Sequence, residues 1–181
     1  PAGAQAPTPA ARATRAAYGP FDTAGELVDQ TYQDVLRRDP TAAERQVATA
    51  ALEGGQTPAE FVVALTETAE SNANVRSVIR LYRAYYLRNP DYMGLGYWIL
   101  QRRAGATLSH VSNQFAAAPE FALRYGSLDD GQFVDLVYQN VLGRGPDARG
   151  RAYWLDLLGQ GLYRGQLMTK FSESPEYVSK S

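Results

Sequence analysis

Two aspartates, Asp91 and Asp147, follow prolines in segments rich in turn-forming residues. Carboxylates clustered in a loop could bind Ca²⁺, which takes several oxygen ligands. An aspartate can equally cap a helix by accepting a hydrogen bond from a backbone N–H near its start. A third segment of the same pattern has Thr41 instead, which is a good cap and a poor calcium ligand, and the dense carboxylate series of an EF-hand loop is missing. We therefore interpret Thr41, Asp91 and Asp147 as helix N-caps and predict no bound metal.

Three arginines are each followed, 32 residues later, by a glutamate. A guanidinium could bind an anion or a sugar, or it could form an ion pair with that carboxylate. Because arginine and glutamate recur together at one spacing, we favour structural ion pairs, with each guanidinium also near the carbonyls that end a helix. The predicted pairs are Arg38 with Glu70, Arg88 with Glu120, and Arg144 with Glu176.

Adjacent aromatic residues occur twice, as Tyr97-Trp98 and Tyr153-Trp154. Neighbouring residues of a helix point about 100° apart, so one ring can pack in the core while the other reaches the surface. The favoured interpretation is packing in the core and between repeats. The alternative is a sugar-stacking platform for a cell-wall or capsular glycan, and the sequence leaves both open.

The sequence lacks the residue patterns of the common catalytic sites. His110 is the single histidine and cysteine is absent, which excludes thiolate nucleophiles and most zinc sites. Neither an HExxH motif nor a glycine-rich phosphate loop is present. The adjacent acids Asp129 and Asp130 resemble capping residues of the next helix. We predict a protein that is not an enzyme and needs no cofactor; a hydrolase with an unrecognised acid pair is the weaker alternative.

These residues recur because the sequence contains three internal copies of one pattern. Aligned on Tyr32, Tyr82 and Tyr138, each copy has the arginine six residues on, a proline eight residues on and the glutamate 38 residues on, without a gap. A glycine also recurs 23 residues on, as Gly55, Gly105 and Gly161. The predicted organisation is an N-terminal arm over residues 1–24 and helical repeats over residues 25–75, 76–127 and 128–181, of which the first is degenerate.

Each copy is predicted to contain three helices. The first is amphipathic and ends near the proline, which disfavours helix in the residue before it. The second begins after Thr41, Asp91 or Asp147 and ends at the recurring glycine. Thr57-Pro58 marks the start of a third. We therefore predict an all-α fold, in which three tandem three-helix repeats of about 50 residues pack as a short solenoid or fused bundle.

The string VLGRGPDARGRAYW, from Val141 to Trp154, carries a family resemblance. Together with Phe133, Phe171 and the SPEY motif that begins at Ser174, it resembles the bacterial domain of unknown function 4214, with its pattern F-x4-Y-x3-LGR-x-PD-x2-G-x2-YW. The second copy, YYLRNPDYMGLGYW, has Tyr-Leu where the family has Leu-Gly, and the first keeps only the Arg-x-Pro frame and the glycine. The resemblance covers residues 26–181 and weakens toward the N-terminus.

The resemblance implies a helical module of exported bacterial proteins that are often surface-layer or adhesin-like. It implies no established catalytic residues. The chain is also distantly similar to the linker-polypeptide domain of phycobilisomes, which holds other proteins together.

Residues 1–20 are rich in alanine, proline and threonine, with Arg12 and Arg15 as their only charged residues. A short helix could start at Pro9 and continue to Tyr18, and so short a helix is marginal in water unless it docks. We expect this arm to lie on its own repeats or on a neighbouring subunit. Such a beginning is typical of the sequence after a cleaved secretory signal, so we expect a secreted protein; the alternative is an arbitrary trimming of the chain.

The composition limits the classes of partner that this chain is expected to bind. The chain has 45% hydrophobic and 20% charged residues, which is globular, and its formal net charge of −1 does not favour nucleic acid. No apolar run approaches the ~20 residues of a membrane span. We expect an exported, non-catalytic structural protein that self-assembles at the cell surface, into a filament or a surface layer, through repeat faces and the arm. The alternative is a module that binds a surface glycan or another surface protein through its edge aromatics.

Overall fold

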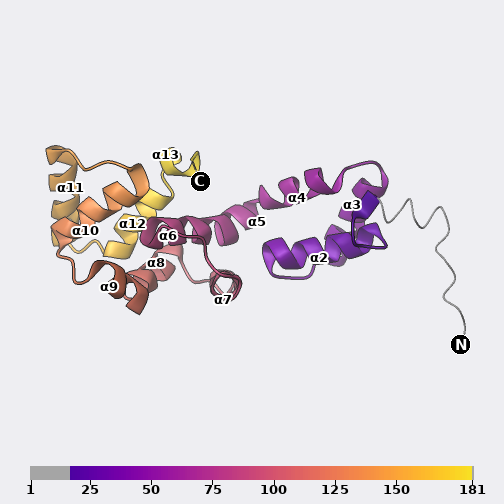
Figure 1. Cartoon of the computed structure of the whole chain (residues 1–181), viewed down its shortest axis with the longest axis horizontal. Coiled ribbons are helices and arrows are strands. Elements are labelled where there is room, and N and C mark those ends of the chain that lie inside the picture. Colours follow the sequence, from indigo (N-terminus) through magenta and orange to yellow (C-terminus); the bar gives the residue numbers. More distant parts are fainter. Residues whose placement is uncertain (1–16, 181) are drawn as a thin grey trace, which may run out of the picture. The chain divides into compact units, whose positions relative to one another are not determined.

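The computed structural model describes residues 17–180, and the regular secondary structure of this part of the chain is all helical, without a strand (Figure 1). The expected all-α class is confirmed. The chain divides into two compact units, Pro1–Asn72 and Ala73–Ser181. The boundary lies three residues before the expected start of the second copy, and the second and third copies lie in one unit.

The first unit contains the helices α2 (Ala24–Leu36), α3 (Ala42–Glu53), α4 (Pro58–Thr66) and the single turn α5 (Ala69–Ser71). A threonine precedes each helix, and its hydroxyl accepts a hydrogen bond from the N–H three residues on; these threonines are Thr23, Thr41, Thr57 and Thr68. Local sequence therefore fixes each start. The apolar faces bury Val28, Leu36, Leu52, Phe61 and Leu65.

The π-helical turn η1 (Asn72–Arg76) crosses the unit boundary. The second unit then has α6 (Ser77–Tyr86), α7 (Tyr92–Arg103), α8 (Leu108–Ala116), α9 (Pro119–Tyr125), α10 (Asp130–Val137), the π-helical turn η2 (Tyr138–Leu142), α11 (Ala148–Gly159), α12 (Arg164–Ser172) and α13 (Pro175–Val178).

One core unites the helices of the second unit. It includes Tyr85 of α6, Val111 of α8, Phe133 of α10 and Leu167 of α12, which are all fully buried. Helices α8 and α12 are in close contact, and the Gly165 N–H donates to Asn113 Oδ1 at 3.0 Å. The second and third copies are thus two halves of a single hydrophobic core.

Glycines end the second helix of each copy at the positions expected from sequence. Gly55, Gly105 and Gly161 have φ of +109°, +98° and +99°, a region that favours glycine. In α3 the N–H of Gly55 donates to the Leu52 carbonyl, and the next N–H donates to the Ala51 carbonyl, which is a Schellman motif. The same two bonds follow α7 and α11.

Candidate functional site

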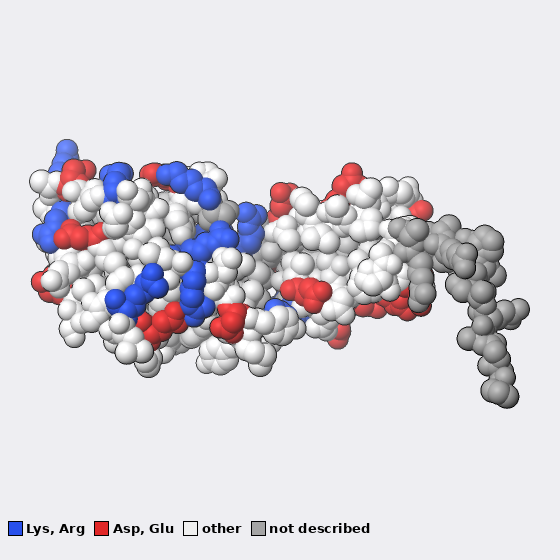
Figure 2. Space-filling model, viewed as in Figure 1, with Lys and Arg blue, Asp and Glu red and all other residues white. Residues whose placement is uncertain are grey.

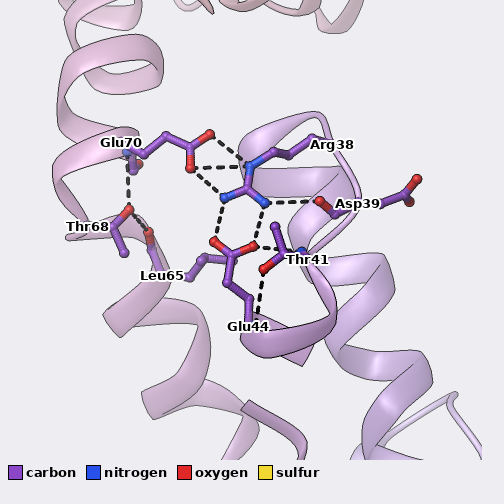
Figure 3. Close-up of polar contacts among 8 residues, drawn as sticks. Arg38, Asp39, Thr41, Glu44, Leu65, Thr68 and Glu70 are labelled. Carbon is purple, nitrogen blue, oxygen red and sulfur yellow. Dashed lines mark hydrogen bonds and ion pairs between the residues drawn. The ribbon is translucent and has the colours of Figure 1, made fainter. Parts of the chain in front are cut away.

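The Arg38 guanidinium is the centre of a polar cluster in the first unit (Figure 3). Its Nε donates to Glu70 at 3.0 Å, and its Nη2 donates to Glu70 at 2.6 Å and to Glu44 at 2.7 Å. Its Nη1 donates to Glu44 at 2.8 Å and to the Asp39 carbonyl at 3.0 Å. A guanidinium has five N–H donors, and all five are occupied here. Arg38 therefore joins α2, α3 and α5 and has no donor left for an anion.

Hydrogen bonding sets the protonation of this cluster. Hydrogen bonds from Arg38 lower the pKa of Glu44 from 4.5 to about 2. The hydrogen bonds to Glu44 and Glu70 raise the pKa of Arg38. Both groups remain charged at neutral pH, so the cluster is unsuited to acid–base catalysis.

Arg88 occupies the equivalent position in the second copy. Its Nε and Nη2 donate to the two carboxylate oxygens of Glu120, both at 2.7 Å, and its Nη1 donates to the Asn89 carbonyl at 3.0 Å. The hydrogen bond from Arg88 lowers the pKa of Glu120. The pair joins the end of α6 to the start of α9.

The third expected pair is not formed. Between Arg144 and Glu176 the structure has no hydrogen bond or ion pair within residues 17–180, and Lys180 Nζ lies 3.0 Å from Glu176 instead. Lys180 lies four residues after Glu176 and can reach its carboxylate within one helical turn. Arg144 retains the other contact of its counterparts, with its guanidinium carbon 5.8 Å from the centre of the Tyr138 ring. The corresponding distance is 5.2 Å for Arg38 over Tyr32 and for Arg88 over Tyr82.

The recurring loop residues lie at helix starts. Thr41, Asp91 and Asp147 accept hydrogen bonds from the N–H of the third residue of α3, α7 and α11, at 3.2, 2.8 and 2.8 Å. The bond from Gly94 lowers the pKa of Asp91. Within the described range, no three metal-ligating side chains are close enough together to bind an ion. The geometry is that of caps.

Glycine at the third position of α7 and α11 has a reason that the sequence did not reveal. A Cβ on Gly94 would lie 2.7 Å from the Tyr82 hydroxyl oxygen, and one on Gly150 would lie 2.7 Å from that of Tyr138. The tyrosine hydroxyl therefore needs the space that glycine leaves. In the first unit Glu44 occupies this position and binds Arg38.

The two aromatic pairs are divided between core and surface. Trp98 packs edge-on against Phe115 at 5.4 Å between ring centres, and Trp154 packs against Phe171 at 5.2 Å. Their neighbours face solvent, with Tyr97 55% and Tyr153 57% exposed. The tyrosines are therefore the members of the pairs that a ligand could contact.

A second exposed apolar feature lies on α7. Met93, Tyr97 and Leu100 are spaced for one helix face and are 77%, 55% and 58% exposed. We call these three residues the α7 stripe. The equivalent positions of α11 are Arg149, Tyr153 and Asp156, so α11 does not present the apolar stripe of α7. The i, i+4, i+7 spacing was visible in the sequence but was not recognised there.

Charge is unequally divided between the two units. Residues 17–72 contain three basic and ten acidic residues, a net charge of −7, whereas residues 73–180 contain 13 basic and nine acidic residues, a net charge of +4. Figure 2 shows most of the visible Lys and Arg side chains over the second unit. The overall charge of −1 conceals this segregation.

Most of the proposed arm lies outside the described residues, which include Tyr18 but not Pro9, Arg12 or Arg15. Tyr18 is half-buried. Within residues 17–180, no helix has the length and apolar character to cross a membrane.

Residues 112–181 match the model of a protein family described as "Domain of unknown function (DUF4214)". This range includes the whole third copy and the end of the second, and over it the chain is similar to that family. No curated protein and no solved structure matches the chain.

Proposed function

We propose that this chain is a non-catalytic, exported structural protein made of three copies of one helical unit, and that it assembles head to tail with further copies of itself. The segregation of charge carries the proposal: residues 17–72 have a net charge of −7, or −5 when Arg12 and Arg15 of the same unit are included, and residues 73–180 have +4. Opposite charge on two units of one chain favours contact between the acidic unit of one copy and the basic unit of the next. Such contacts build open chains when the rotation between copies does not close.

Two further features support assembly over catalysis. The recurring arginines Arg38 and Arg88 are committed to internal carboxylates, and the recurring caps stabilise helix starts. The α7 stripe provides an apolar contact surface of the kind that partner helices or grooves cover.

The test is self-association measured by sedimentation velocity at several protein and salt concentrations. We expect concentration-dependent growth at about 25 mM NaCl that weakens about tenfold at 300 mM, because salt screens contacts between exposed charges. The triple change Arg124→Glu, Arg149→Glu and Lys170→Glu turns the charge of the second unit from +4 to −2 and should abolish association. These three side chains are exposed.

The matched control keeps the charge at the same positions, with Arg124→Lys, Arg149→Lys and Lys170→Arg. This variant should associate like the unmodified chain. A protein that stays monomeric at low salt and high concentration, or that associates equally after charge reversal, contradicts the proposal.

A second candidate function is glycan binding at the cell surface. The exposure of Tyr97 and Tyr153, each beside a packed tryptophan, favours it, because a held aromatic ring can stack on a sugar face. The double variant Tyr97→Ala and Tyr153→Ala should then lose retention on cell-wall polysaccharide in affinity electrophoresis. Equal retention of both proteins rejects this function.

A further inference from the structure

An open groove of about 550 Å³ lies in the first unit between α3 and α4. Its walls are mainly apolar and include Val47, Ala48, Ala51, Phe61, Ala64 and Leu65. Tyr32 of α2 and Glu44 also line it, so the groove borders the Arg38 cluster of Figure 3. Nothing in the proposed assembly uses this groove.

The second unit shows what fills the equivalent space. Helices α3, α7 and α11 each have 12 residues and begin after an equivalent cap, and α4, α8 and α12 each have nine. The seventh residue of the longer helix is Ala48 in the first unit and Trp98 or Trp154 in the second. The eighth residue of the shorter helix is Leu65 against Phe115 or Phe171. An indole ring in the second unit thus corresponds to open space in the first.

The groove also contains a hydroxyl group, that of Tyr32, which can accept a hydrogen bond from an indole ring. In the second unit the Tyr82 hydroxyl oxygen lies beside the first turn of α7, 2.7 Å from where a Cβ on Gly94 would be, and Trp98 follows one helical turn later. Tyr32 is the counterpart of Tyr82 and lines the groove. Its hydroxyl has no hydrogen-bond partner within residues 17–180. The groove therefore combines an apolar slot with a hydroxyl that can accept a hydrogen bond from a ring N–H.

We propose that the groove between α3 and α4 binds a small planar aromatic molecule that carries a ring N–H, of the indole class. The inference rests on the structural equivalence of the three copies that the proposed function assumes. Ring burial between Ala48 and Leu65 supplies the affinity, and the Tyr32 hydroxyl selects for the N–H donor. For a ligand of this size in an open groove we expect a dissociation constant of about 0.1–1 mM.

Titration of the full chain with indole, followed by methyl and amide NMR shifts, tests the site. We expect saturable shifts at the methyls of Ala48, Ala51 and Leu65, with intermolecular NOEs from the indole protons. Ala48→Trp supplies the missing ring from the chain itself and should abolish binding. Ala50→Trp, on an exposed position of α3 outside the groove, is the matched control and should bind indole like the unmodified chain.

The role of Tyr32 has its own test. Indene has the size of indole without the N–H and should bind the unmodified chain about threefold to tenfold more weakly, since one hydrogen bond is lost. In Tyr32→Phe the two ligands should bind alike. An unchanged preference for indole in Tyr32→Phe overturns the assignment of the donor site.

The remaining outcomes are also decisive. Three outcomes would each overturn the proposal: indole binding that persists in Ala48→Trp, NOEs to other methyls, or no shifts at 5 mM indole. If Ala48→Trp fails to fold, the NOEs measured on the unmodified chain decide. If indole does not bind but Ala48→Trp blocks self-association, the groove holds a second copy; the ligand proposal then fails while the proposed function stands. If indole binds as expected but the chain shows no salt-dependent association, the proposed function fails while the ligand proposal stands.

Discussion

A charged residue that recurs in several copies can serve a ligand or the fold, and its hydrogen-bond donors distinguish the two. All five donors of Arg38 go to groups of its own unit, and three donors of Arg88 bind Glu120 and a backbone carbonyl. The two guanidinium groups also lie over Tyr32 and Tyr82. Arg38 and Arg88 thus connect the end of the first helix of their copies to elements that come later in the chain.

The Arg38 cluster predicts a pH dependence of stability. The pKa of Glu44 is about 2 in the folded chain against an ordinary value of 4.5, so the pair contributes fully above pH 4.5 and is lost as the pH falls toward 2. Because Glu44 is about one-third exposed, solvent screening reduces the contribution to about 1 kcal/mol. Glu44→Gln should therefore destabilise the first unit at pH 7 and show a flatter stability profile between pH 4.5 and 2. The measurement is urea unfolding monitored by the methyl NMR signals of Leu36 and Leu52.

The control for this profile is Glu53→Gln, at the exposed end of α3, which removes a carboxylate without a hydrogen bond or ion pair in the described structure. Its stability at pH 7 should match that of the unmodified chain. An acid profile for Glu44→Gln as steep as that of the unmodified chain would show that the ion pair does not contribute.

Backbone strain at the end of the first helices gives a second prediction at this scale. Leu87 has φ +53° in the left-handed region, where its counterpart Gly143 has +69°. Leu87 is 54% exposed, so Leu87→Gly removes strain with little loss of packing and should stabilise the second unit by about 0.5–1 kcal/mol. The reverse change, Gly143→Ala, meets no neighbouring atom but adds strain, and should cost about 1 kcal/mol in urea unfolding. Destabilisation by Leu87→Gly would contradict this account.

Among the elements, the contact between α8 and α12 depends on a missing side chain. A Cβ on Gly165 would lie 2.6 Å from the Asn113 backbone nitrogen, which cannot move without shifting α8. We expect Gly165→Ala to destabilise the second unit by about 1–3 kcal/mol, measured by urea unfolding with tryptophan fluorescence. Gly159→Ala is the control, because the end of α11 has open space there and alanine favours helix. Equal stability of the two variants would show that α8 and α12 tolerate separation.

The elements also show what the sequence could predict. Helix starts at Thr41, Asp91 and Asp147 and the glycine stops at Gly55, Gly105 and Gly161 lie where the sequence predicted them, because caps and left-handed turns depend on a few neighbouring residues. The π-helical turns η1 and η2 have no such local signal, and Arg37 and Leu87 adopt positive φ without being glycine.

Contacts between elements were less predictable. Spacing alone predicted three arginine–glutamate pairs, and Lys180 replaces Arg144 in the third because the local partner is nearer. In the sequence, the groove beside Ala48 is indicated only by the small residue at that position, because the shape of the groove depends on how α3 packs against α4. The segregation of charge could have been found by counting residues on either side of residue 72.

At the scale of the whole molecule, two units with separate cores need not unfold together. The large core of the second unit contains only residues from Val78 onward, whereas Leu52 and Phe61 belong to the core of the first. Both tryptophans lie in the second unit, so tryptophan fluorescence reports that unit alone, while far-UV circular dichroism reports the helices of both.

This difference in reporters makes the independence of the units measurable with a matched pair of core leucines. Leu52 in the first unit and Leu167 in the second are 3% and 0% exposed, and truncation of either to alanine should cost about 2–5 kcal/mol in its own unit. In urea unfolding, Leu52→Ala should lower the midpoint of part of the circular dichroism change and leave the fluorescence midpoint in place, whereas Leu167→Ala should lower the fluorescence midpoint. If Leu52→Ala moves both signals together, the chain unfolds as one cooperative body and the two units are not independent.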